Sequence, residues 1–338
     1  VPCGGNFDGA AGVLAGLAAI AGWRRAGAAP PREVTLMAIR AEESVWFDAS
    51  YIGSRAAFGL LEPSELDSVR RSDDKRTLCA HIADCGGDVA ALRRGAAHLS
   101  PARIAAFIEP HIEQGPDLLA RGAPIGIVTG IRGASRRREA VCHGEYAHSG
   151  ATPRALRRDA VVAVAALIGE LEALWSALEA EGEDATITVG RLFTDAAAHG
   201  FSKVAGRVDF SLDMRSRAQA TLDRLDRELD AVAARVARAH GVRFDLGPRS
   251  ATVPAEMNAG LVDRLAGAAR SRGVEAPRMA CGAGHDAAVF AARGVPTGMI
   301  FIRNAHGSHN PREAMDMADF AVAAATLSDF CLALDDAP

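Results

Sequence analysis

The sequence predicts an α/β fold in which a mixed, mostly parallel sheet flanked by helices carries an inserted α+β domain. Apolar strand-like segments alternate with helical segments at both ends of the 338-residue chain, a pattern typical of an open sheet with helices on both faces. Between about residues 133 and 249 the expected order becomes β-α-β-β-α-β, which is the ferredoxin-like arrangement. We therefore predict an outer domain formed by residues 1–132 and 250–338, and an inserted domain formed by residues 133–249.

The elements of the outer domain follow from local patterns. Residues 7–27 are expected to form a helix, because Asp8 lies near its start, small apolar residues fill it and Gly27 follows its basic last turn. Residues 33–40 are largely apolar and are predicted to form a strand that ends at the acidic pair Glu42–Glu43. The remaining expected elements are a strand in 105–115, a helix at 258–272, a short helix in 282–292, a strand at 296–302 and a helix from about 316.

The inserted domain is expected to contain strands and helices of ordinary length. Its strands are predicted at 135–143, 185–193, 206–214 and 242–246, and its helices at 156–178 and 217–240. The basic run Arg136–Arg138 is interpreted as a solvated strand edge.

Composition restricts the class of protein. With 49% hydrophobic and 24% charged residues, the chain reads as a globular protein with a sizeable core. A net charge of -4 gives no reason to expect a nucleic acid or a membrane surface as partner, and no apolar run approaches the ~18–20 residues of a membrane span. The six cysteines are scattered without a CxxC pair, which predicts reduced thiols in the cytoplasm.

Four short segments place carboxylates or histidines beside glycine or proline, and all four lie in the outer domain: GGNFDG (4–9), AEES (41–44), HIEQG (111–115) and SHNP (308–311). Each is weak alone, since Asp8 could simply cap its helix. Open α/β sheets, however, bind ligands outside the carboxyl ends of their strands.

Imidazole and carboxylate groups are the ligands that zinc and manganese take in proteins. A pair of such ions can polarise an amide carbonyl and activate a water molecule. Asp8, Glu43, His111 and His309 could supply the ligands, and Glu42 could shuttle protons.

The chain also resembles a known family along its length, from Gly4 to the last helix. The segments GGNFDGAAGVLAG, HIEQGPDLLARGAPIGIVTGI, GEYAHSGATP, VDFSLDMRS, GAGHDAAVFA and SHNPRE resemble the N-carbamoyl-L-amino-acid hydrolase and allantoate amidohydrolase family. That family is the amidase branch of the co-catalytic zinc peptidases related to aminoacylase.

The resemblance implies hydrolysis of the C–N bond of an N-carbamoyl amino acid or related ureido acid, giving the amino acid, carbon dioxide and ammonia. It implies two divalent ions, zinc or manganese, with cobalt and nickel as alternatives. It also implies that the outer domain is catalytic, and that the inserted domain is a lid through which two copies form a homodimer.

Site residues carry over position by position. The resemblance implies that Asp8 bridges the two ions, that Glu43 and His111 bind one of them and His309 the other, and that Glu42 is the general base.

In the inserted domain, His148 resembles the histidine that stabilises the oxyanion in the partner's active site. Arg215 resembles the arginine that binds the substrate carboxylate. Gln114, in the outer domain, resembles a substrate-contacting glutamine, and His285 and Asp286 lie in a Gly-rich loop that lines the pocket. Ser202 stands where the family usually has an asparagine, so the substrate contact there must differ or come from His199.

The family has a further metal-binding histidine, in a His-x-Asp segment before the Gly-rich turn, and the printed chain begins after that point. We expect the natural polypeptide to be longer and to carry it. Two alternative functions stay open: an aminoacylase- or dipeptidase-type peptidase on the same fold, and a catalytically impaired paralogue acting as a binding subunit. The motifs are compatible with α- and β-ureido acids and with allantoate alike.

Overall fold

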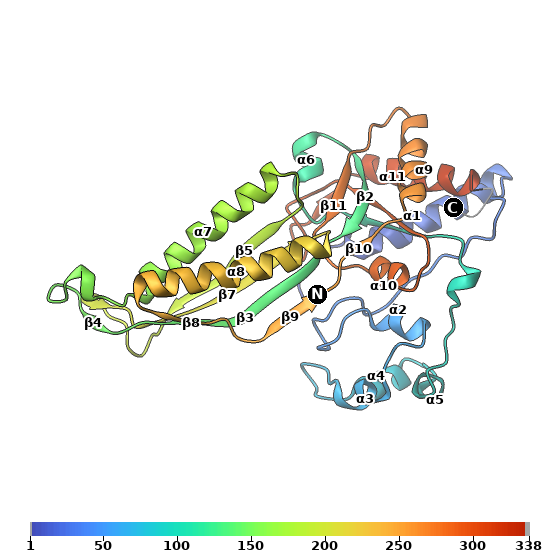
Figure 1. Ribbon diagram of the computed structural model, residues 1–338. Coiled ribbons are helices and arrows are strands. Elements are labelled where there is room, and N and C mark those ends of the chain that lie inside the picture. Colours follow the sequence, from blue (N-terminus) through green and yellow to red (C-terminus); the bar gives the residue numbers. More distant parts are fainter. Residues whose placement is uncertain (1, 335–338) are drawn as a thin grey trace. The chain divides into compact units, whose positions relative to one another are not determined.

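The structure is a computed structural model that describes residues 2–334 (Figure 1). The chain divides into two compact units. The first joins Val1–Ile131 with Glu256–Pro338, and the second is Arg132–Ala255.

A mixed sheet forms the centre of the first unit, as predicted. The strand order is β1 (Phe107–Ile112), β12 (Thr297–Ile302), β2 (Ile125–Ile131) and β10 (Ala255–Glu256), and β11 (Arg278–Cys281) also pairs with β2. The pairs β1–β12 and β11–β2 are parallel, whereas β12–β2 is antiparallel. Every residue of β12 is buried, which is typical of a strand covered on both faces.

Helices α1 (Asp8–Ala26), α9 (Ala259–Ser271), α10 (Asp286–Ala292) and α11 (Met317–Leu332) pack on this sheet. Helix α1 begins at Asp8 and ends before Gly27, whose φ of 63° gives the left-handed C-terminal cap. Its buried residues recur every four positions, as a helix with one core-facing stripe requires: Ala11, Ala15, Ala19 and Trp23. The Trp23 indole donates to Ser328 Oγ of α11 at 2.8 Å.

Residues 52–121 hold short helices for which the sequence analysis made no assignment: α2 (Ile52–Ala57), α3 (Pro63–Ser68), α4 (Leu78–Asp84), α5 (Val89–Arg93), the 3₁₀ turn Pro101–Arg103 and α6 (Asp117–Arg121). Part of this region has a small core of its own, formed by Ile52, Leu61, Leu66 and Leu78. The strands β13 (Asn304–Ala305) and β14 (Ala314–Met315) form a separate two-stranded sheet.

The predicted strand at residues 33–40 is wrong. The segment forms no β-ladder with any strand of the described chain, and Val34 and Leu36 are 39% and 36% exposed. An apolar run becomes a strand only when a neighbouring backbone pairs with its N–H and C=O groups, and here no such neighbour lies alongside it.

The second unit has the predicted ferredoxin-like order: β3 (Gly133–His143), α7 (Ala160–Ala180), β5 (Thr186–Thr194), β7 (Arg207–Ser216), α8 (Gln219–His240) and β8 (Arg243–Asp245). The spatial order is β5-β7-β3-β8, with antiparallel neighbours. Helices α7 and α8 lie side by side on this sheet (Figure 1). The smaller elements are β9 (Arg249–Thr252), which pairs with β3, the two-stranded sheet of β4 (Ala147–His148) and β6 (Lys203–Val204), and the 3₁₀ turn Arg154–Leu156.

Two expectations for this unit need correction. Arg137 is not a solvated edge residue, because it is 7% exposed and lies 3.3 Å from Asp226 of α8. Helix α7 is long and apolar enough to pass as a membrane span, with a window of mean hydropathy 1.8 that is 28% buried. Its buried residues, such as Leu167 and Leu171, belong to the core between helix and sheet, so its composition is explained by packing within the unit.

Candidate active site

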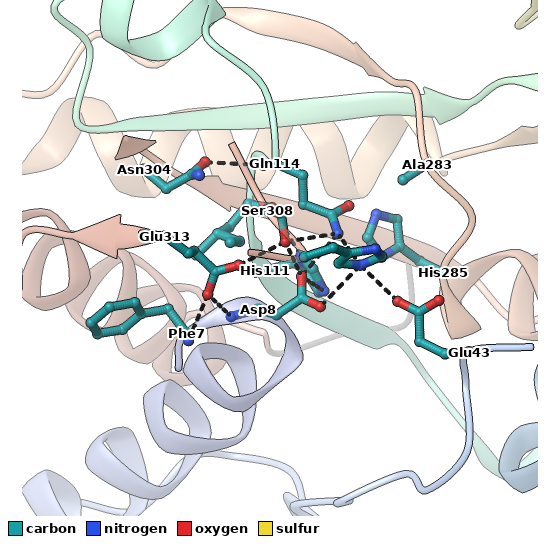
Figure 2. A network of polar contacts seen from close by, with 12 residues as sticks. Phe7, Asp8, Glu43, His111, Gln114, Ala283, His285, Asn304, Ser308 and Glu313 are labelled. Carbon is teal, nitrogen blue, oxygen red and sulfur yellow. Dashed lines mark hydrogen bonds and ion pairs between the residues drawn. The ribbon is translucent and has the colours of Figure 1, made fainter. Parts of the chain in front are cut away.

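Three predicted ligands converge in the first unit. His309 Nε2 lies 2.9 Å from Glu43 Oε1 and 3.4 Å from Asp8 Oδ2, and one ligand atom from each residue lies within 4.8 Å of the others (Figure 2). Two carboxylates and an imidazole form a donor set that suits zinc or manganese. These residues therefore make a candidate metal centre.

His111 extends this centre from strand β1. The side chain is 6% exposed, and its Nδ1 lies 2.8 Å from the carbonyl oxygen of Ile112. A carbonyl can only accept, so Nδ1 carries the proton and Nε2, which lies 3.7 Å from Asp8 Oδ1, keeps its lone pair for a ligand. Burial lowers the pKa of His111 and so favours the neutral, metal-binding form. Glu43 contacts His309 here, whereas the resemblance groups Glu43 with His111.

The loop that carries His309 has an unusual backbone. His306, Gly307 and His309 all have positive φ angles, between 59° and 68°, which non-glycine residues rarely adopt. Asn304 fixes this loop by donating from Nδ2 to Gly307 O at 2.8 Å. The Oδ1 atom of Asn304 accepts the backbone N–H of Gln114 at 3.0 Å, so one side chain links the segments that follow β1 and β12.

Glu313 ties the same loop to the start of α1 (Figure 2). It is 6% exposed and accepts the backbone N–H groups of Phe7 and Asp8 at 2.8 and 3.1 Å, and the Ser308 hydroxyl at 2.7 Å. Burial raises its pKa, but these hydrogen bonds outweigh that effect and leave it below its ordinary value. The close approach requires glycine at position 5, because a Cβ there would lie 2.2 Å from Glu313 Cδ.

Gln114, predicted to contact substrate, lies at the metal centre. Its Nε2 donates to Asp8 Oδ1 at 2.9 Å, and Ser308 Oγ donates to the same oxygen at 3.1 Å. Its buried Oε1 has no hydrogen-bond partner among the described residues. Gln114 thus orients a predicted ligand and keeps a buried acceptor.

Glu42, the predicted general base, lines a cavity of about 640 Å³ together with Asp8, Glu43, His111 and His285. Burial, followed by the charges of Glu43, Asp286, Glu109 and Asp8, raises the pKa of Glu42 to about 9. The group therefore responds strongly to any change of charge nearby.

His285 is 2% exposed, and its ring centroid lies 4.4 Å from that of His111. Burial, followed by the neighbouring His111, holds the pKa of His285 well below its ordinary value. Its Nε2 has no hydrogen-bond partner in the part of the chain that the structure describes. Asp286 does not point away from the protein either: it is 4% exposed and accepts the Ser54 hydroxyl.

In the second unit, His148 has a defined tautomer. The backbone N–H groups of Gly150 and Ala151 donate to its Nδ1 at 3.2 and 3.1 Å, so the ring proton of the neutral form lies on Nε2. His148 can then donate a hydrogen bond without being charged. Ser202 lies close by in the backbone, since its carbonyl accepts the N–H of Ser149 at 3.0 Å, and its own side chain is exposed.

Arg215, the predicted carboxylate-binding residue, is held on β7 by Asp213. Its Nε and Nη2 donate to the two oxygens of Asp213 at 3.0 and 2.6 Å. The two units carry their predicted site residues separately: Asp8, Glu42, Glu43, His111, Gln114, His285 and His309 in the first, and His148, Ser202 and Arg215 in the second.

Known proteins with similar sequences and folds agree on one family. The model of peptidase family M20/M25/M40 matches residues 4–333. The chain belongs to this family. An N-carbamoyl-L-amino-acid amidohydrolase of Paenarthrobacter aurescens is 35% identical over 320 residues, covering 94% of this chain and 74% of the relative.

Two further relatives of this M20-family protein have the same character. The allantoate amidohydrolase of Escherichia coli (strain K12) is 33% identical over 329 residues, covering 96% of this chain and 76% of the relative. A crystal structure of an amidase of the hydantoinase/carbamoylase family from Burkholderia multivorans has a TM-score of 0.85 at 29% identity, covering 98% of this chain and 77% of that one. The M20-family chain is therefore an amidohydrolase.

Sequence reasoning missed three residues of this M20-family site: Asn304, Ser308 and Glu313. Ser308 and Glu313 stand within the segment SHNPRE, so the motif contained them, but only the partners about 300 positions away reveal their contacts.

Proposed function

We propose that this M20-family amidohydrolase cleaves the C–N bond of an N-carbamoyl amino acid or a related ureido acid with the help of two divalent metal ions. The observation that carries the proposal is the convergence of Asp8, Glu43 and His309 within 4.8 Å, beside a buried Glu42 in one cavity. The names of the similar amidohydrolases supply the substrate class.

The donor set names the residues that would hold the ions: Asp8, Glu43, His111 and His309. Bound there, zinc or manganese would polarise the substrate carbonyl and make a water molecule acidic enough to attack it. Positive charge at this place offsets the carboxylates that raise the pKa of Glu42, which brings Glu42 into the range where it accepts a proton from water.

Proton transfer through Glu42 then completes the reaction. Glu42 takes the proton of the attacking water and returns it to the leaving nitrogen, which makes cleavage of the C–N bond possible near neutral pH. The buried Oε1 of Gln114 is suited to accept a ureido N–H, because it lacks a partner among the described residues.

The inserted unit contributes two groups in this proposal. His148 donates from Nε2 to the oxygen on which negative charge develops, and its neutral tautomer requires no proton uptake. Arg215 binds the substrate carboxylate, for which a rigid guanidinium fork is better suited than an ammonium group.

We also propose that two copies associate through this unit. Strand β5 is an edge of its sheet and carries Leu192 and Phe193, which are 52% and 58% exposed. Helix α7 exposes Val161 and Val162 at 45% and 50%. An unpaired edge with apolar side chains is a template for pairing with a second copy.

Elemental analysis combined with a substrate panel tests the function. We expect about two metal ions per chain after supplementation with zinc or manganese, and release of ammonia from N-carbamoyl amino acids but not from dipeptides. Cleavage of dipeptides with no reaction on ureido acids would favour the peptidase alternative. A protein that binds no metal and cleaves neither class would favour the impaired paralogue.

A further inference from the structure

The sheet of the second unit has one face packed against helices and one face without them. Along β7, Val208, Phe210, Leu212 and Met214 are buried in the core formed with α7 and α8. The alternate residues point to the other face and are only partly buried. They are charged or polar: Arg207, Asp209, Ser211, Asp213 and Arg215.

Asp213 lies between two arginines on this face. It accepts Nε and Nη2 of Arg215 at 3.0 and 2.6 Å and Nε of Arg136 at 3.2 Å. Arg136 is its direct partner across the β3–β7 ladder, so the backbone register brings the second arginine to this place. About a quarter to a third of each of the three side chains is exposed.

This arrangement fixes the plane of the Arg215 guanidinium. A free arginine side chain has about 2 kcal/mol of rotamer entropy to lose when it binds a carboxylate. Side-on pairing with Asp213 uses Nε and Nη2 and removes most of that freedom in advance. Two guanidinium groups and one carboxylate also leave one net positive charge, which matches a single carboxylate.

We propose that Asp213 is a positioning residue for Arg215, and that Arg136 is a second arginine of the same carboxylate-binding site. This inference rests on the proposed function, in which Arg215 binds the carboxylate of the ureido acid. Asp213 holds Arg215 in the orientation that receives the substrate, and Arg136 adds positive charge that Asp213 alone would otherwise cancel.

The charge state of Asp213 agrees with this role. Burial raises its pKa, but the hydrogen bond and the charges of Arg215 and Arg136 outweigh burial and bring the pKa below the ordinary value. Asp213 therefore stays ionised wherever a carboxylic acid substrate is ionised.

A matched pair on the same strand provides a control. Arg207 and Asp209 have the same spacing and the same side-on geometry, at 2.8 and 2.7 Å. The cross-strand partner of Asp209 is Val141 instead of an arginine. Asp209→Asn therefore removes an equivalent ion pair from the same face without touching Arg215.

The experiment compares each ureido acid with its carboxamide, which lacks the charge. For the wild-type protein, Asp213→Asn, Asp209→Asn, Arg136→Gln and Arg138→Gln, kcat/KM is measured on both compounds. Arg138 is exposed on the same strand as Arg136 and serves as its control. We expect Asp213→Asn and Arg136→Gln to reduce the preference for the acid about tenfold, mainly through KM, because a hydrogen-bonded charge is weakened.

The ratio separates positioning from stability. A variant that is merely less folded loses activity on acid and amide equally, so its preference stays at the wild-type value. Unchanged preference in Asp213→Asn and Arg136→Gln, or an equal change in Asp209→Asn, would overturn the inference while the proposed function stands. Absence of hydrolysis of every ureido acid by the metal-supplemented wild-type protein would overturn the proposed function itself, and this inference with it.

Discussion

Replacing Glu313 with alanine removes one acceptor from three donors at once: the N–H groups of Phe7 and Asp8 and the hydroxyl of Ser308. Because Glu313 is 6% exposed, water can replace the acceptor only in part. Each buried donor left without a partner costs about 1–3 kcal/mol. We expect the free energy of unfolding to fall by about 3 kcal/mol, the lower end of that sum, since the hydroxyl of Ser308 can rotate toward Asp8.

Metal affinity should fall as well, because Glu313 joins the segments that carry Asp8 and His309. Groups that hold metal ligands in place typically contribute 10–100-fold to affinity. Glu313→Gln keeps one acceptor oxygen and should weaken zinc binding about tenfold, and Glu313→Ala about a hundredfold. Gly5→Ala should act in the same direction, because its Cβ would displace the Glu313 side chain.

The assay is titration of chelator-treated protein with zinc in competition with a colorimetric chelator, alongside urea unfolding. Asp159→Asn is the matched control, since its carboxylate accepts two backbone N–H groups at 3.0 and 3.2 Å in the other unit. It should lose about 1 kcal/mol of stability and keep its zinc affinity. Wild-type zinc affinity in a folded Glu313→Ala protein would refute the reasoning.

Three further predictions concern turnover, pH and assembly. His148→Ala should lower kcat about a hundredfold with unchanged metal content by elemental analysis, and equal loss of both would contradict its role as a donor to the oxyanion. In chelator-treated protein the raised pKa of Glu42, about 9 against 4.5, means that the folded state binds a proton that the unfolded state releases. The free energy of unfolding should therefore decrease as pH rises from about 4.5 to about 9. Glu42→Gln should make that decrease less steep in urea unfolding at a series of pH values, and an identical slope would count against the assignment. Phe193→Asp should lower the dimer fraction measured by light scattering, whereas Met317→Asp, at a residue 62% exposed in the other unit, should not. Equal mass in all three proteins would remove the case for an interface at β5.

Much of the fold could be read from short-range patterns. The ends of α1 follow from Asp8 and Gly27, and the alternation of polar and apolar residues in 207–216 marks β7. The β-α-β-β-α-β order of the inserted unit follows from such patterns taken in sequence. These features depend on residues within a few positions of one another, so the sequence contains all the information that they need.

The candidate site shows the same division between local and distant information. Its ligand types were visible in the motifs, because acidic residues and histidines beside glycine or proline stand out in the chain. Their support was not visible: Glu313 acts on residues more than 300 positions away, and Asn304 acts on Gln114 across 190 positions. Which predicted ligand approaches which other one also depended on the loop that carries His309.

The sequence by itself determined the family motifs, the helices with their caps, and the alternating strands, since each is set by local spacing and residue type. Only the tertiary structure decided that 33–40 is not a strand, because pairing depends on a backbone neighbour that no local pattern contains. The same holds for Arg137 and Arg136: one is buried against Asp226 and the other shares Asp213 with Arg215. A charged side chain is solvated or paired according to what the fold brings beside it, and that is a property of distant segments of the chain.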